Sequence, residues 1–105
     1  MGDRANVYIH EGDEPGVYLY THWTGTELPD TVRASLDSPR GRSRYNDAAY
    51  LARIIFEDMI SDDLGSETGY GISPYPPDGD DHIVDINVGF SETKVTLVGY
   101  NEDDE

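Results

Sequence analysis

Three arginines lie close together in a chain that is otherwise strongly acidic. Arg40, Arg42 and Arg44 alternate within the loop-like stretch SPRGRSR and make up three of the seven basic residues. A guanidinium group donates paired hydrogen bonds to phosphate or carboxylate, so these arginines could bind a small anion or a nucleotide. They could instead pair with the chain's own carboxylates and anchor a loop between two helices, and we favour that second interpretation.

A second candidate site is a row of aromatic and histidine side chains at alternating positions of the segments ANVYIH and VYLYTHW. Tyrosine is common in protein interfaces because its ring packs while its hydroxyl group stays hydrogen-bonded. The row could therefore support self-association into a homo-oligomer or bind another protein. It could also be the solvated side of an ordinary strand, since aromatic residues favour β-structure. The row consists of Tyr8, His10, Tyr18, Tyr20 and His22.

The remaining patterns do not favour metal binding or catalysis. His10 and His22 are expected on one face but out of register, with Cα atoms more than about 10 Å apart, too far for two ligands of one ion. His82 follows the segment DGDD, which resembles part of a calcium loop but lacks the glutamate expected after it. The chain has no cysteine and none of the common nucleotide-binding or hydrolase motifs. We therefore expect a non-enzymatic protein without metal or cofactor.

The row of aromatic residues is positioned by a predicted antiparallel hairpin with the turn EGDEPG between its strands. We expect Ile9 opposite Leu19 and, on the other side, Tyr8 opposite Tyr20. The apolar side would then join the core. That side consists of Ala5, Val7, Ile9, Val17, Leu19 and Trp23.

Helical periodicity begins after this hairpin. A spacing of four residues separates Leu28, Val32 and Leu36, and Pro29 is suited to the first turn of a helix. This pattern predicts a short amphipathic helix that ends before SPRGRSR. Asn46 or Asp47 should cap a second helix over about 47–62. Its apolar stripe is broad, which indicates a central core helix. The stripe consists of Ala48, Leu51, Ala52, Ile54, Ile55 and Met59.

Three further strands are expected after the helices: a short one beginning near Tyr70, then 82–90 and 93–100, which alternate apolar and polar residues. The order strand–strand–helix–helix–strand–strand–strand predicts an α+β domain in which a mainly antiparallel sheet carries two helices on one face. We expect a single domain over 1–100 and an acidic tail over 101–105. The opposite sheet face, with the tyrosine row, should be open.

Charge is the strongest global feature: 22 acidic residues against seven basic ones give a net charge of -15. Such a chain repels itself in dilute buffer, and high salt removes that repulsion. We therefore expect a salt-adapted protein, and we weighed acidic mimicry of nucleic acid as a less favoured alternative. Direct nucleic-acid binding is disfavoured because the partner is also a polyanion. The start of the chain has no apolar targeting segment, so we expect a soluble, cytoplasmic protein that does not bind membranes.

Several stretches together resemble a family of short uncharacterised proteins from bacteria, phages and haloarchaea. They are RANVYIHEGDEPGVYLYTHW, LPDTVRASL, DAAYLARIIFEDMI and ETGYGIS, and they cover most of positions 4–73. The acidic, lysine-poor composition is similar to the haloarchaeal branch. The resemblance implies a shared fold, and it implies no activity, cofactor or catalytic residue.

Overall fold

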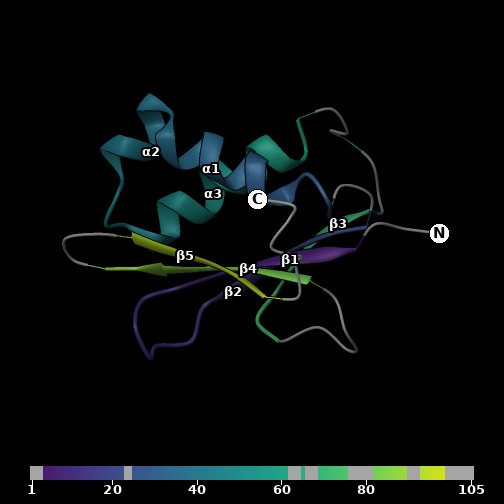
Figure 1. Ribbon diagram of the computed structural model, residues 1–105, viewed down its shortest axis with the longest axis horizontal. Coiled ribbons are helices and arrows are strands. Elements are labelled where there is room, and N and C mark those ends of the chain that lie inside the picture. The colour runs from purple at the N-terminus through teal and green to yellow at the C-terminus, as the bar shows by residue number, and fades with distance from the viewer. Residues whose placement is uncertain are drawn as a thin grey trace.

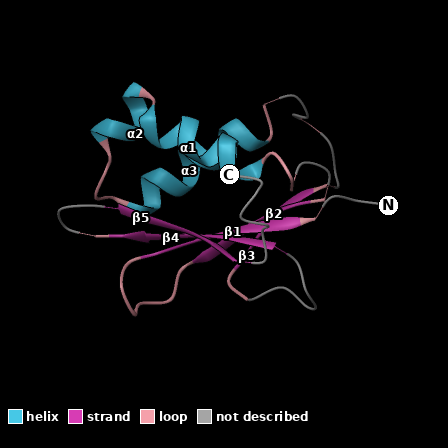
Figure 2. Ribbon diagram, viewed as in Figure 1, coloured by secondary structure: helices cyan, strands magenta, loops and turns pink. Residues whose placement is uncertain are grey.

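The computed structural model describes residues 4–22, 25–61, 65, 69–75, 82–89 and 93–98. In this part of the chain three helices form a layer over one face of a five-stranded sheet (Figure 1). The strands are β1 (Ala5–His10), β2 (Val17–Thr21), β3 (Tyr70–Ser73), β4 (His82–Val88) and β5 (Thr93–Val98). The helices are α1 (Leu28–Asp37), α2 (Pro39–Ser43) and α3 (Ala48–Met59). Figure 2 shows the two layers, with the three helices on one side of the sheet.

The sheet is mixed, with the strand order β3-β2-β1-β4-β5. Three of its described strand pairs are antiparallel, and the central pair β1–β4 is parallel. The α+β class is therefore confirmed, and the sheet is mainly antiparallel. The parallel pair was not predicted: β1 and β4 are far apart in the chain, and a strand's own alternation does not indicate which neighbour it will have.

The register of the β1–β2 hairpin differs from the prediction by two residues. Val7 lies opposite Leu19 and Tyr8 opposite Tyr18, where we expected Tyr8 opposite Tyr20. A shift of two residues keeps every side chain on its predicted face, so the alternation cannot distinguish the two registers. The turn decides between them. It is tightened by Gly12 with φ of 59° and by a hydrogen bond from Glu14 N to Glu11 O of 3.0 Å.

The core lies between the sheet and the helix layer. Alternate residues of β1, β2 and β4 are buried on this side, as the period of two predicts, and they pack against one stripe each of α1 and α3. Burying each large aliphatic side chain stabilises the fold by about 1.5–3 kcal/mol. Trp23, expected in this core, lies outside the described residues. The core cluster consists of Ala5, Val7, Ile9, Leu19, Leu28, Val32, Leu51, Ile55, Met59, Val84, Ile86 and Val88.

The two longer helices form where the sequence predicts them. The side chain of Asp47 caps α3 by accepting a hydrogen bond of 3.2 Å from Tyr50 N. The helix ends at Met59, so its described extent is shorter than the predicted 47–62. Helices α1 and α3 are joined by a hydrogen bond of 2.5 Å from Ser35 Oγ to Asp58 Oδ2.

The prediction of a loop over SPRGRSR was wrong in its middle, where α2 forms. Ser38 caps this short helix by accepting a hydrogen bond of 3.1 Å from Gly41 N, and Pro39 occupies the first turn. Gly41 is buried because α2 packs closely on the end of α1. A Cβ atom at this position would overlap with the carbonyl oxygen of Ser35.

No helix in the described ranges is both long enough and apolar enough to cross a membrane.

Candidate functional site

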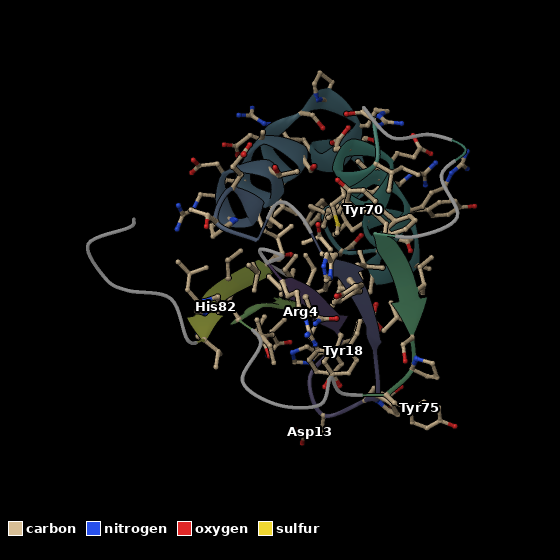
Figure 3. The ribbon with its side chains drawn as sticks, turned by 90° about the vertical axis from the view of Figure 1, so that its right-hand side faces the viewer. Arg4, Asp13, Tyr18, Tyr70, Tyr75 and His82 are labelled. Carbon is tan, nitrogen blue, oxygen red and sulfur yellow. The ribbon has the colours of Figure 1, made fainter. Side chains whose placement is uncertain are left out.

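The predicted tyrosine row lies on the face of the sheet that the helices leave uncovered. In Figure 3 the helices lie above the sheet and Tyr18 projects below it. Tyr8, Tyr18 and Tyr20 alternate along their strands with the buried residues Val7 and Leu19, so they share this lower face. We call it the open face. Its described strand residues and their flanking neighbours are Arg4, Asn6, Tyr8, His10, Tyr18, Tyr20, His22, Gly71, Ser73, Ile83, Asp85, Asn87, Lys94, Thr96 and Val98.

Three rings of the open face form a continuous stack. The ring centroids of Tyr8 and Tyr18 are 4.3 Å apart with an interplanar angle of 17°. On its other side Tyr8 stacks on His10 at 4.6 Å and 16°. All three side chains are partly buried. The tyrosines are therefore held in a defined arrangement before any partner binds.

Both nitrogens of the His10 ring face hydrogen-bond acceptors. Nδ1 lies 2.8 Å from the carbonyl oxygen of Gly12, and Nε2 lies 2.7 Å from Asp85 Oδ1. The carbonyl can only accept, so Nδ1 donates to it, and a second proton on Nε2 lets the ring donate to the carboxylate as well. Burial of the ring lowers the pKa of His10. The hydrogen bonds with Asp85 and Gly12 and the negative charges of Asp85 and Asp13 raise this pKa by more than burial lowers it. The pKa of His10 is therefore above its usual value.

Other polar groups of the open face are also paired with one another. Tyr20 Oη lies 2.8 Å from His22 Nδ1, and Gly12 N donates a hydrogen bond of 2.9 Å to Asn87 Oδ1. Burial, followed by the charges of Tyr8 and Asp85, raises the pKa of Tyr18, which keeps its hydroxyl group protonated. Asn6 is the exception. It is 3% exposed, and its Nδ2 has no hydrogen-bond acceptor within the part of the chain that the structure describes.

The open face differs in charge from the chain as a whole. Asp85 is the one carboxylate among its described strand residues, and His10 partly balances it. Lys94 adds an exposed positive charge on the same face. Asp13, in the turn between β1 and β2, lies below the sheet beyond Tyr18 in Figure 3, and its charge also acts on His10. The described strand residues of the open face are therefore rich in aromatic rings and include one acid.

The arginines that the sequence grouped together do not all point to one place. Arg40 and Arg44 line a groove of about 320 Å³ between α2 and α3, whereas Arg42 is exposed and does not line it. Arg53 of α3 completes the set, and we missed it in the sequence. Its spacing of four from Glu57 was a usable signal, because such residues face each other on a helix. We call this the arginine groove, lined by Arg40, Ser43, Arg44, Tyr50, Arg53, Ile54 and Glu57.

Glu57 lies at the centre of the arginine groove. Its Oε1 accepts a hydrogen bond of 2.8 Å from Arg40 Nη1, and its Oε2 accepts one of 2.8 Å from Arg53 Nε. These two bonds lower the pKa of Glu57, so its carboxyl group stays ionised. Arg40 Nη2 also lies 3.7 Å from Asp58 Oδ1. The predicted internal pairing with carboxylates thus exists for Arg40, while the guanidinium of Arg44 lies 4.6 Å from the centroid of the Tyr50 ring.

The structure does not bring the three histidines together. His10 contacts Asp85, His22 contacts Tyr20, and His82 begins β4. Within the described ranges no group of three or more His, Cys, Asp or Glu residues could hold a metal ion. The calcium-loop fragment DGDD, at 78–81, lies outside those ranges. Comparisons of the chain with protein-family models, with curated proteins and with solved structures found no match.

Proposed function

We propose that this chain is a non-enzymatic protein-interaction module that associates with a second copy of itself through the open face. The observation that carries the proposal is the charge of that face. Asp85 is the one carboxylate among its described strand residues, with Asp13 in the adjoining turn, in a chain whose net charge is -15. Two such chains repel each other over most approaches, and the repulsion is weakest where carboxylates are few.

The aromatic stack supports the same conclusion. Tyr8, Tyr18 and His10 already pack on one another, so little side-chain freedom is lost when a second surface covers them. Tyrosine rings supply contact area at low entropic cost, and they are enriched in interfaces for that reason.

The size of the face favours a weak, reversible dimer. Five strands spaced about 4.8 Å apart and about six residues long form a surface of roughly 20 Å by 24 Å. Face-to-face contact of two copies would then bury roughly 1,000 Å² in total, which is at the lower end of specific interfaces. We therefore expect association to depend on protein concentration and to strengthen with salt, because salt screens the repulsion between the remaining acidic surfaces.

The molar mass of the protein in solution, measured by light scattering at a fixed high KCl concentration, tests this proposal. The wild-type chain should exceed the monomer mass at high concentration, and Tyr18→Ser with Tyr20→Ser should shift it towards the monomer with an unchanged circular dichroism spectrum. The matched control is Tyr45→Ser with Tyr50→Ser, since both tyrosines are about half exposed and lie outside the open face. The control should keep the wild-type mass.

Thr96→Glu provides a second variant that leaves the aromatic stack intact. Thr96 is exposed on the open face, so the new carboxylate adds repulsion between the two copies without disturbing the core. It should also shift the mass towards the monomer. A wild-type chain that is monomeric at every concentration would contradict the proposal, and so would a dimer that both sets of open-face variants leave intact.

A further inference from the structure

The arginine groove lies apart from the open face, at the helix layer. Helix α2 lies at the top left of Figure 1, on the side away from the sheet. The groove's volume of about 320 Å³ is at the small end of ligand sites in proteins, which suits a small molecule. Ile54 and the ring of Tyr50 give it an apolar wall, and three guanidinium groups give it donors.

Internal ion pairs do not use up these donors. Arg40 and Arg53 share the single carboxylate of Glu57, each through one nitrogen at 2.8 Å. Arg44 makes no ion pair with any residue that the structure describes. A guanidinium group has five N–H donors in a planar fork. The whole fork of Arg44 and the two Nη groups of Arg53 therefore remain available to a ligand.

The groove also carries a surplus of positive charge. Three arginines face one glutamate, and including Asp58, 3.7 Å from Arg40, still leaves the positive charges in excess. Glu57 accepts hydrogen bonds from Arg40 and Arg53, and the Tyr50 ring contacts Arg44, so each arginine has a partner that favours its position in the groove. Pre-organised guanidinium groups lose less entropy when they bind an anion. In a chain of net charge -15 this local surplus is unexpected for an ordinary surface.

We propose that the arginine groove binds a small phosphate-class dianion, with Arg44 and Arg53 as its principal ligands and Arg40 at its edge. A dianion balances the charge of +2 that the three arginines and Glu57 carry together, or exceeds it by one where Asp58 is counted, and its oxygens can each accept hydrogen bonds from a guanidinium fork. This inference is independent of self-association, because none of these residues belongs to the open face.

Calorimetric titration with inorganic phosphate and with AMP tests the inference, at the lowest KCl concentration at which the circular dichroism spectrum is that of the folded protein. The wild-type chain should bind, and Arg44→Gln and Arg53→Gln should each weaken binding about tenfold or more, because each removes charge-assisted hydrogen bonds. Arg42→Gln is the matched control. Arg42 belongs to the same short helix but does not line the groove, so its loss should leave the affinity within about twofold.

The two ligands distinguish a free phosphate site from a nucleoside phosphate site. Equal affinity would show that the phosphate group alone is recognised, and tighter binding of AMP would show that the apolar wall at Tyr50 contacts the rest of the molecule. Both results support the inference. Absence of binding by the folded wild-type chain would overturn it, as would binding that neither Arg44→Gln nor Arg53→Gln weakens.

Glu57→Gln separates an anion site from a purely internal ion-pair network. The amide keeps one acceptor oxygen, so it can accept from one of the two arginines while its NH2 group faces the other, and it no longer competes as a negative charge. Phosphate affinity should therefore rise severalfold in this variant. If the arginines served only to pair with Glu57, the variant would unfold more easily and bind no phosphate, which would contradict the inference.

Discussion

His10 and Asp85 are 75 positions apart in the chain, and they meet across the central strand pair with His10 Nε2 2.7 Å from Asp85 Oδ1. In the register of β1 and β4 Asp85 lies opposite Tyr8, so the histidine ring reaches it diagonally. The contact connects the N-terminal hairpin to the C-terminal strands. It also raises the pKa of His10 through the hydrogen bond and the charge of Asp85.

The first prediction is that this contact makes stability depend on pH. The pKa of His10 is raised in the folded protein above the value of about 6.5 in an unfolded chain, so the folded state binds the proton more tightly. Its stabilising contribution is fully present below about pH 6.5 and is lost as pH rises through the folded-state pKa. Urea unfolding of wild type and His10→Gln should therefore differ more at pH 6 than at pH 9.

Asp85→Asn provides the check on the cause. Removing the carboxylate should lower the pKa of His10, as followed by the NMR titration of its ring, and should flatten the pH dependence of the urea midpoint. His22→Gln should leave the NMR titration of the His10 ring unchanged, because His22 contacts Tyr20 and not Asp85. An equal stability gap between wild type and His10→Gln at both pH values would show that the ring only packs.

The second prediction concerns the stack of Tyr8 on Tyr18, whose ring centroids are 4.3 Å apart. Stacked aromatic pairs contribute about 0.5–1.5 kcal/mol beyond the area that they bury. A double-mutant cycle with Tyr8→Leu and Tyr18→Leu, measured by urea unfolding at constant salt, should give a coupling energy in that range. Additive effects of the two substitutions would mean that the rings are adjacent without stabilising each other.

The third prediction concerns the close packing of α2 on α1. Gly41→Ala would push a methyl group onto the carbonyl oxygen of Ser35, so α2 must move, at a cost of about 1–3 kcal/mol. The free energy of unfolding should fall by that amount. Gly71→Ala is the control, because a Cβ atom there meets nothing within 4 Å. Equal tolerance of both substitutions would show that α2 is not held against α1.

The fourth prediction is that the thermal midpoint rises with KCl, because the net charge of -15 makes the folded chain repel itself. The Debye length falls from about 8 Å at 0.15 M to about 3 Å at 1 M, so screening predicts that most of the rise occurs below about 1 M. Calorimetric scans across this range measure it. A midpoint that does not change with salt would remove the main support for a salt-adapted protein.

Apart from α2, the sequence alone was sufficient to predict the local elements and the faces of β1, β2, β4 and the two longer helices. The alternation in β1, β2 and β4 and the spacing of Leu28 and Val32 in α1 predicted which side chains enter the core. These patterns arise from the geometry of one strand or one helix, and burial of apolar surface selects the face. Asp47 was one of the two N-caps expected for α3 for the same reason, since capping depends on a few neighbouring residues.

The relationships between elements were decided only by the tertiary structure. A period of two is unchanged by a two-residue shift, so the turn set the hairpin register. The parallel pairing of β1 with β4 places Asp85 beside His10. The packing of α2 on α3 places Arg53 in the arginine groove and leaves Arg42, which the sequence grouped with Arg40 and Arg44, outside it. Each of these contacts joins residues whose own neighbours in the chain carry no information about the partner. Their distances therefore follow from how the elements pack, and each candidate site combines such contacts with local ones such as Arg53–Glu57 and Tyr8–His10.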